Sequence, residues 1–110
     1  MALRDGLYRV HFQTPMGEGN GVAVLEGGRL RGGDSMIYYV GTYKQDGDRF
    51  TAEVQTDEHS NMQGMASVFG VSKASITIQG KTGNDTAEMT GSSPQAPGVA
   101  FKASLHRLHD

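Results

Sequence analysis

A glycine-rich stretch near the start of this 110-residue sequence is the first candidate for chemistry. Gly17, Gly19 and Gly21 have a spacing with which backbone amides can cradle a phosphate group. Such a cradle also needs a helix whose N-terminus faces the phosphate, whereas here the run from Val22 to Val24 continues in strand alternation. The glycines therefore predict a chain that turns sharply, not a nucleotide-binding loop.

A second apparent motif, Gly80-Lys81-Thr82, resembles the end of an ATP-binding P-loop. The first glycine of that motif would stand at position 75, which is a serine, and no helical pattern follows the tripeptide. We therefore expect an ordinary hairpin turn at these three residues.

Acid–base and metal chemistry have equally few candidates. His106 and His109 are three residues apart, so on a strand they point to opposite faces and cannot share a metal ion. Glu53 and Glu88 are isolated on predicted outer faces, and no Ser-His-Asp set can be placed. There is no cysteine, which excludes a thiolate nucleophile and thiolate metal sites. The sequence predicts no enzyme activity, no cofactor and no metal.

Composition narrows the class of partner. The formal net charge is −2 and the basic residues are scattered, so no nucleic-acid-binding surface is expected. The first ten residues lack the apolar run of a secretion signal, and no stretch has membrane-spanning length. We expect a cytoplasmic protein that has no contact with a membrane.

Six segments alternate apolar and polar residues, which is the pattern of half-buried β-strands. Turn residues separate them, and segments 29–33 and 36–43 bring the total to about eight strands. Closing such a meander removes its exposed edges. We predict an all-β fold, a single antiparallel eight-stranded barrel spanning residues 1–110, with bulges or bends at Gly19, Gly21, Gly32 and Gly33. The expected apolar faces are Tyr8, Val10 and Phe12; Val22 and Val24; Phe50, Ala52 and Val54; Ala74, Ile76 and Ile78; Ala87 and Met89; and Val99, Phe101, Ala103 and Leu105.

One segment, Thr56 to Ser72, breaks the strand pattern. It is long for a hairpin, and Met62, Met65 and Phe69 recur at helical spacing. We expect a short helix or a long loop that closes one end of the barrel, with a lid over a ligand as the alternative.

The segment from Met36 to Tyr43 is apolar on both faces. With Met36, Tyr38 and Val40 pointing inward, the outward side chains would be Ile37, Tyr39 and Tyr43. Because a solvated face should not carry such residues, we predict a homodimer or partner interface there, with cover by the chain's own loops as the alternative.

A barrel of this size can be filled by side chains or can hold one small ligand. The alternative function is therefore a carrier of a small hydrophobic molecule. The expected lumen contacts are Tyr8, Phe12, Tyr38, Phe50 and Phe101.

Two turns carry acidic residues. Asp34 follows paired glycines and is expected to accept nearby backbone N–H groups, which is a structural role. Asp46 and Asp48 lie at a predicted hairpin tip, where they are either simply solvated or available to a basic partner such as a DNA-binding protein.

An ordered set of elements in the first half of the chain resembles the GrlR family, negative regulators associated with type III secretion. The set comprises the segments 5–8, 17–21, 27–28 and 32–34, then Phe12, Tyr39, Gly41 and the acidic hairpin. The resemblance implies a small calycin-like, or lipocalin-like, barrel that forms a homodimer. It also implies that the protein sequesters a transcriptional activator and does not bind DNA itself. Of the family's acidic run at the hairpin, Asp46 and Asp48 are present and would form the partner contact.

Overall fold

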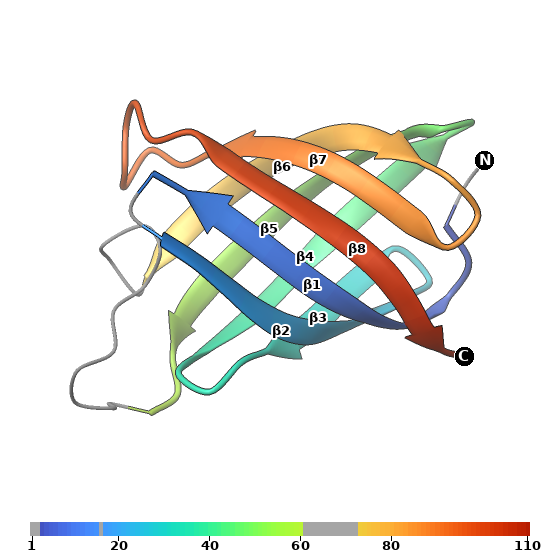
Figure 1. Ribbon diagram of the computed structural model, residues 1–110, viewed down its shortest axis with the longest axis horizontal. Helices are drawn as coiled ribbons and strands as arrows, with labels where there is room; N and C mark the ends of the chain where they lie inside the picture. Colours follow the sequence, from blue (N-terminus) through green and yellow to red (C-terminus); the bar gives the residue numbers. More distant parts are fainter. Residues whose placement is uncertain (1–2, 16, 61–72) are drawn as a thin grey trace.

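The computed structural model describes residues 3–15, 17–60 and 73–110. The chain forms one closed barrel in which each strand pairs antiparallel with its neighbours in sequence, and β1 pairs with β8 (Figure 1). This confirms the predicted all-β, eight-stranded barrel. The strands are β1 (Gly6–Thr14), β2 (Gly17–Glu26), β3 (Arg29–Gly33), β4 (Ile37–Asp46), β5 (Arg49–Glu58), β6 (Ala74–Thr82), β7 (Thr86–Ser92) and β8 (Phe101–His109).

Strand alternation positions the core. In β5 the inward residues Phe50, Ala52 and Val54 are buried, while the residues between them are exposed. The predicted apolar faces of β6, β7 and β8 also point into the barrel. In β2 the predicted face is reversed, because Ala23 and Leu25 are buried whereas Val22 and Val24 are exposed.

The expected short helix is not borne out, because no helix occurs in the described ranges. Strand β5 continues through the start of the predicted segment, as far as Glu58. Residues 61–72, which hold the helical spacing of methionines and phenylalanine, lie outside the described residues.

Two hairpin turns use glycine in the left-handed region. Gly27 and Gly28 have φ of 58° and 85° between β2 and β3, which is typical of a type I′ turn. Gly47 has φ of 64° and begins the two-residue turn between β4 and β5. The prediction for Gly80-Lys81-Thr82 was wrong, since these residues end β6 and the turn follows them.

The four glycines predicted to form bulges or bends, Gly19, Gly21, Gly32 and Gly33, lie instead in regularly paired strands. The register is unbroken from Gly6↔Leu25 to Thr14↔Gly17 and from Val22↔Gly33 to Glu26↔Arg29. A Cβ on Gly19 would lie 2.7 Å from the Phe12 ring, and one on Gly21 would overlap the Tyr39 hydroxyl. Glycine at positions 19 and 21 therefore makes room for aromatic side chains inside the barrel.

One end of the barrel is closed by side chains and by the N-terminal segment. This closed end, where β1 begins and β8 ends, contains the fully buried Tyr8, Leu25 and Phe50. Leu3 lies across it and exchanges two hydrogen bonds with the Gln45 side chain, of 2.6 and 3.1 Å. The chain therefore fills this half of the interior, and any ligand space must lie in the other half.

Candidate functional site

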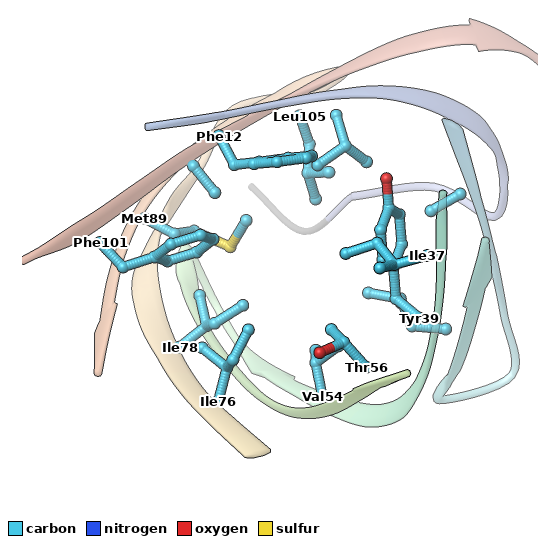
Figure 2. A pocket seen from close by; sticks show the side chains of 14 residues that line it. Phe12, Ile37, Tyr39, Val54, Thr56, Ile76, Ile78, Met89, Phe101 and Leu105 are labelled. Carbon is cyan, nitrogen blue, oxygen red and sulfur yellow. The ribbon is translucent and has the colours of Figure 1, made fainter. Parts of the chain in front are cut away.

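The barrel interior retains a cavity of about 60 Å³ in the half opposite the closed end. Figure 2 shows its side chains arranged in a ring around an open centre. All but two of them are apolar, and the exceptions are the hydroxyl-bearing Tyr39 and Thr56. The lining residues are Val10, Phe12, Ala23, Leu30, Ile37, Tyr39, Val54, Thr56, Ile76, Ile78, Met89, Phe101, Ala103 and Leu105.

The predicted lumen contacts divide between three places. Phe12 and Phe101 line the cavity, with ring centroids 6.4 Å apart. Tyr8 and Phe50 are buried in the closed end and do not line it. The inward prediction for Tyr38 was wrong, because 41% of this residue is exposed on the outside of β4.

The Tyr39 hydroxyl connects the cavity wall to the turn between β3 and β4. It donates to Asp34 Oδ2 at 3.2 Å, while Asp34 Oδ1 accepts the backbone N–H groups of Met36 and Ile37 at 2.9 Å each. This confirms that Asp34 accepts nearby backbone amides. Burial raises the pKa of Tyr39 well above its usual range, and the adjacent Asp34 charge and hydrogen bond raise it further.

The raised pKa of Tyr39 predicts a loss of stability at alkaline pH. The folded state favours the neutral phenol of Tyr39. The contribution of Tyr39 to the free energy of unfolding is therefore complete below the unfolded tyrosine pKa of about 10, and it falls as the pH rises above that value. Tyr39→Phe should lower the free energy of unfolding at neutral pH by about 1 kcal/mol, because it loses the bond to Asp34. Above about pH 10 the stability of the Tyr39→Phe variant should decline less steeply than that of the wild type. The difference between the two slopes should reach up to about 1.4 kcal/mol per pH unit. Urea unfolding across this pH range tests this, and parallel pH profiles would contradict it.

The predicted phase of β4 was wrong. Ile37, Tyr39 and Tyr43 were expected to face outward, but all three are buried inside the barrel at 9% exposure or less. The physical reason is the turn before the strand: Met36 is also buried, yet it belongs to the connection that Asp34 organises and precedes the first strand residue. If inward and outward positions are counted from Met36, every side chain of β4 is therefore assigned to the wrong face.

The side chains that do face outward form an apolar surface, which we call the outer strip: Val22 and Val24 of β2 and Tyr38 and Val40 of β4. They are 37–45% exposed, and in the described part of the chain the only other exposed large hydrophobic residue is Leu108. Strand β3 lies between the two pairs and contributes Gly33 and Arg31, since Val22↔Gly33↔Tyr38 and Val24↔Arg31↔Val40 are neighbours in register.

The acidic hairpin tip is a separate surface. Asp46 and Asp48 are both exposed, and among the described residues neither carboxylate forms an ion pair. The backbone oxygen of Asp48 accepts the Thr82 N–H at 2.8 Å, which fixes the turn against the end of β6. At the strand rise of about 3.3 Å per residue, Asp46 lies about 20 Å from Val40 along β4.

One arrangement that sequence reasoning missed resembles a nucleophilic triad. Pairing of β8, β1 and β2 places Ser104 beside His11 and His11 beside Asn20 on the outer face. However, His11 Nδ1 lies 2.9 Å from Asn20 Oδ1 and His11 Nε2 lies 3.6 Å from Glu18, so neither ring nitrogen is directed at Ser104. A strand ladder also leaves few free backbone amides to stabilise an oxyanion. The arrangement does not form an acylation site.

Over residues 3–15, 17–60 and 73–110, no group of three or more histidine, aspartate or glutamate side chains is placed to hold a metal ion. None of the described residues belongs to a helix that could cross a membrane. No protein-family model matches this chain, and no curated protein matches it in sequence. The features of the described residues that bear on function are the cavity, the outer strip and the acidic tip.

Proposed function

We propose that this protein is a non-enzymatic binding protein that acts through contact with other proteins, and that the outer strip is a contact surface. The observation that supports this proposal is the concentration of exposed apolar side chains on the outer strip. A strand with one solvent-exposed face normally carries polar residues on that face. The solvent-exposed face of β4 instead carries Tyr38 and Val40.

The composition of the outer strip suits a protein interface. Tyrosine and arginine are enriched at the energetic centres of such interfaces. Here Tyr38 of β4 shares the outer face with Arg31 of the adjacent strand β3, which pairs with Val40. Covering the strip would remove its apolar area from water, at about 25 cal/mol per Å². A protein partner that docks at this face therefore gains the free energy of burying these apolar side chains.

The resemblance to the GrlR family supports a narrower proposal, in which the protein is a bacterial cytoplasmic regulator that sequesters a transcriptional activator. In that proposal the Asp46 and Asp48 tip contacts a basic surface of the activator, as a second contact distinct from the outer strip. The small net charge of −2, with scattered basic residues, is consistent with a partner that is a protein and not DNA itself.

The volume of the cavity argues against the alternative, a carrier of a hydrophobic ligand. A void of about 150 Å³ holds one benzene ring. On that scale the cavity of about 60 Å³ has room for about two or three non-hydrogen atoms. A larger ligand would have to displace side chains such as Met89 or Phe101, and the protein-binding function requires no such movement.

The proposal predicts that Tyr38→Glu combined with Val40→Lys disrupts protein contact without unfolding the barrel. Both side chains are partly exposed and point away from the core. We expect at least one complex of the wild type, with itself or with a purified candidate activator, to weaken by about 30-fold or more. Light scattering and calorimetry on the protein alone and mixed with the activator measure this effect.

The matched control is Thr51→Glu combined with Gln79→Lys. These residues are also exposed neighbours on the outer face, of β5 and β6, and the control makes the same change in charge. An Asp46→Lys/Asp48→Lys variant in the same assays tests the tip separately. If the Tyr38/Val40 variant forms every complex as the wild type does, the outer strip is not the contact surface.

A further inference from the structure

We infer that the outer strip is the docking surface for an amphipathic helix of a partner protein, and that this helix carries a carboxylate that pairs with Arg31. The inference rests on the proposed function and names the chemistry of the partner at that same surface. It is carried by the position of Arg31, whose charge lies inside the strip, between Val24 and Val40.

Among the described residues, none neutralises Arg31. Its side chain is exposed and forms no ion pair in that part of the chain. Across the outer face, the row that contains it has no acidic residue and reads, from β1 to β5, Leu7, Val24, Arg31, Val40 and Gln55. A partner that covers the strip therefore removes the guanidinium of Arg31 from water, with no compensating charge in the same row.

The acidic residues of the adjoining rows are placed beside other groups. Glu26 lies directly opposite Arg29. Glu53 and Asp57 are two strands away, on β5, a separation of about 10 Å across the sheet. The Asp57 carboxylate also accepts the N–H of the next residue, at 2.8 Å. Because a buried charge without a partner is strongly disfavoured, the docking protein must supply the carboxylate for Arg31.

Recognition on this face must use side chains. Strands β2, β3 and β4 lie side by side and each is paired along both edges, so a partner cannot add a strand here (Figure 1). An α-helix with its side chains is about 10–12 Å wide, and β2 and β4 are about 10 Å apart on either side of β3. A single helix along β3 therefore contacts Val22 and Val24 with one flank and Tyr38 and Val40 with the other.

The spacing along β3 matches one helical repeat. Gly33 and Arg31 are two residues apart, or about 7 Å along the strand, and helix residues i and i+4 are about 6 Å apart on one face. Gly33 has no side chain, so an apolar residue i of the partner can pack there, between Val22 and Tyr38. Residue i+4 then lies over Arg31, and this is the position of the carboxylate.

Two synthetic helical peptides of about 20 residues test the inference. The acidic probe carries leucines on one face and a glutamate four positions after the central leucine, and the basic probe has lysine in place of that glutamate. We expect the wild type to bind the acidic probe at least about tenfold more tightly than the basic probe, and Arg31→Glu to reverse this preference. Amide NMR spectra of the isotopically labelled protein, titrated with each probe to about 1 mM, measure the affinities and locate the contact.

Arg49→Glu is the matched control. Arg49 is exposed on the outer face of β5, away from the outer strip, and the substitution makes the same change in charge. This variant should keep the preference of the wild type for the acidic probe. A reversal by Arg49→Glu as well would mean that net charge, and not Arg31, sets the preference, and the inference would fail.

The remaining outcomes separate this inference from the proposed function. Equal affinity for the two probes, no binding of either, or amide shifts confined to strands other than β2, β3 and β4 would overturn the acidic helix as the occupant. Self-association of the wild type that Arg31→Glu abolishes would also overturn it, because the carboxylate would then belong to a second copy of this chain. If Tyr38→Glu/Val40→Lys still loses its complexes in any of these cases, the outer strip remains a contact surface and only the chemistry of its partner was wrong.

Discussion

We expect Gly32→Ala to lower the free energy of unfolding by about 2 to 3 kcal/mol, although it adds only one methyl group. A Cβ at this position would overlap the carbonyl oxygen of Val22 and lie 2.6 Å from the Cα of Ala23. Both contacts are with the main chain of β2, which is held by pairing to β1 and β3 and cannot rotate away as a side chain can. Relief therefore requires the two strands to separate.

Gly83→Ala is the matched control for this prediction. A Cβ there would lie 3.3 Å from the Thr86 hydroxyl, the end of a side chain that can move, and the stability should stay within about 0.5 kcal/mol of the wild type. Because the chain has no tryptophan, urea unfolding is best followed by circular dichroism. Equal unfolding midpoints for both variants and the wild type would show that β2 and β3 do not approach so closely.

The glycines show what could and could not be predicted about this fold. Hairpin positions such as Gly47 are recognisable because a neighbouring aspartate and the flanking alternation define a turn. Gly19 and Gly21 are not recognisable in that way, because their requirement comes from the rings of Phe12 and Tyr39, which reach them only in the folded barrel. The glycine content therefore predicts that the chain makes sharp turns. It does not predict why a glycine is needed at a given position within a strand, because that need arises from tertiary packing.

The candidate surface was harder to predict, for a related reason. The sequence identified β4 as a strand with two apolar faces, and that remains correct. Which face points outward depends on the residue at which alternation begins, and the buried Met36 of the preceding turn gave the wrong start. A shift of one residue moves every side chain to the other face, so Tyr38 and Val40 were assigned to the lumen.

The cavity and the closed end depend on contacts between distant segments. Leu3 and Gln45 are 42 positions apart, and Arg4 forms an ion pair of 2.7 Å with Asp85 at a still greater separation. No local pattern predicts these contacts. The sequence could therefore predict inward aromatic residues, but not that they fill one half of the barrel and leave a small void in the other.

Phe50→Ala should be among the most destabilising single substitutions, with a loss of about 4 kcal/mol in the free energy of unfolding. Phe50 has no exposed surface, and its ring stacks on Tyr43 with centroids 5.4 Å apart and 16° between the planes. Its removal leaves a void beside Tyr43, in the half of the interior that also contains the fully buried Tyr8 and Leu25.

The neighbour Thr51 provides the control, because it is exposed on the outer face of the same strand and Thr51→Ala should change stability by less than about 0.5 kcal/mol. Phe50→Leu retains most of the buried volume and should cost less than about 1.5 kcal/mol, which keeps the test usable if the alanine variant does not fold. A Phe50→Ala protein as stable as the wild type would mean that the closed end is not packed as described. The space inside the described barrel would then exceed the cavity of about 60 Å³, and its volume would no longer favour protein contact over ligand carriage.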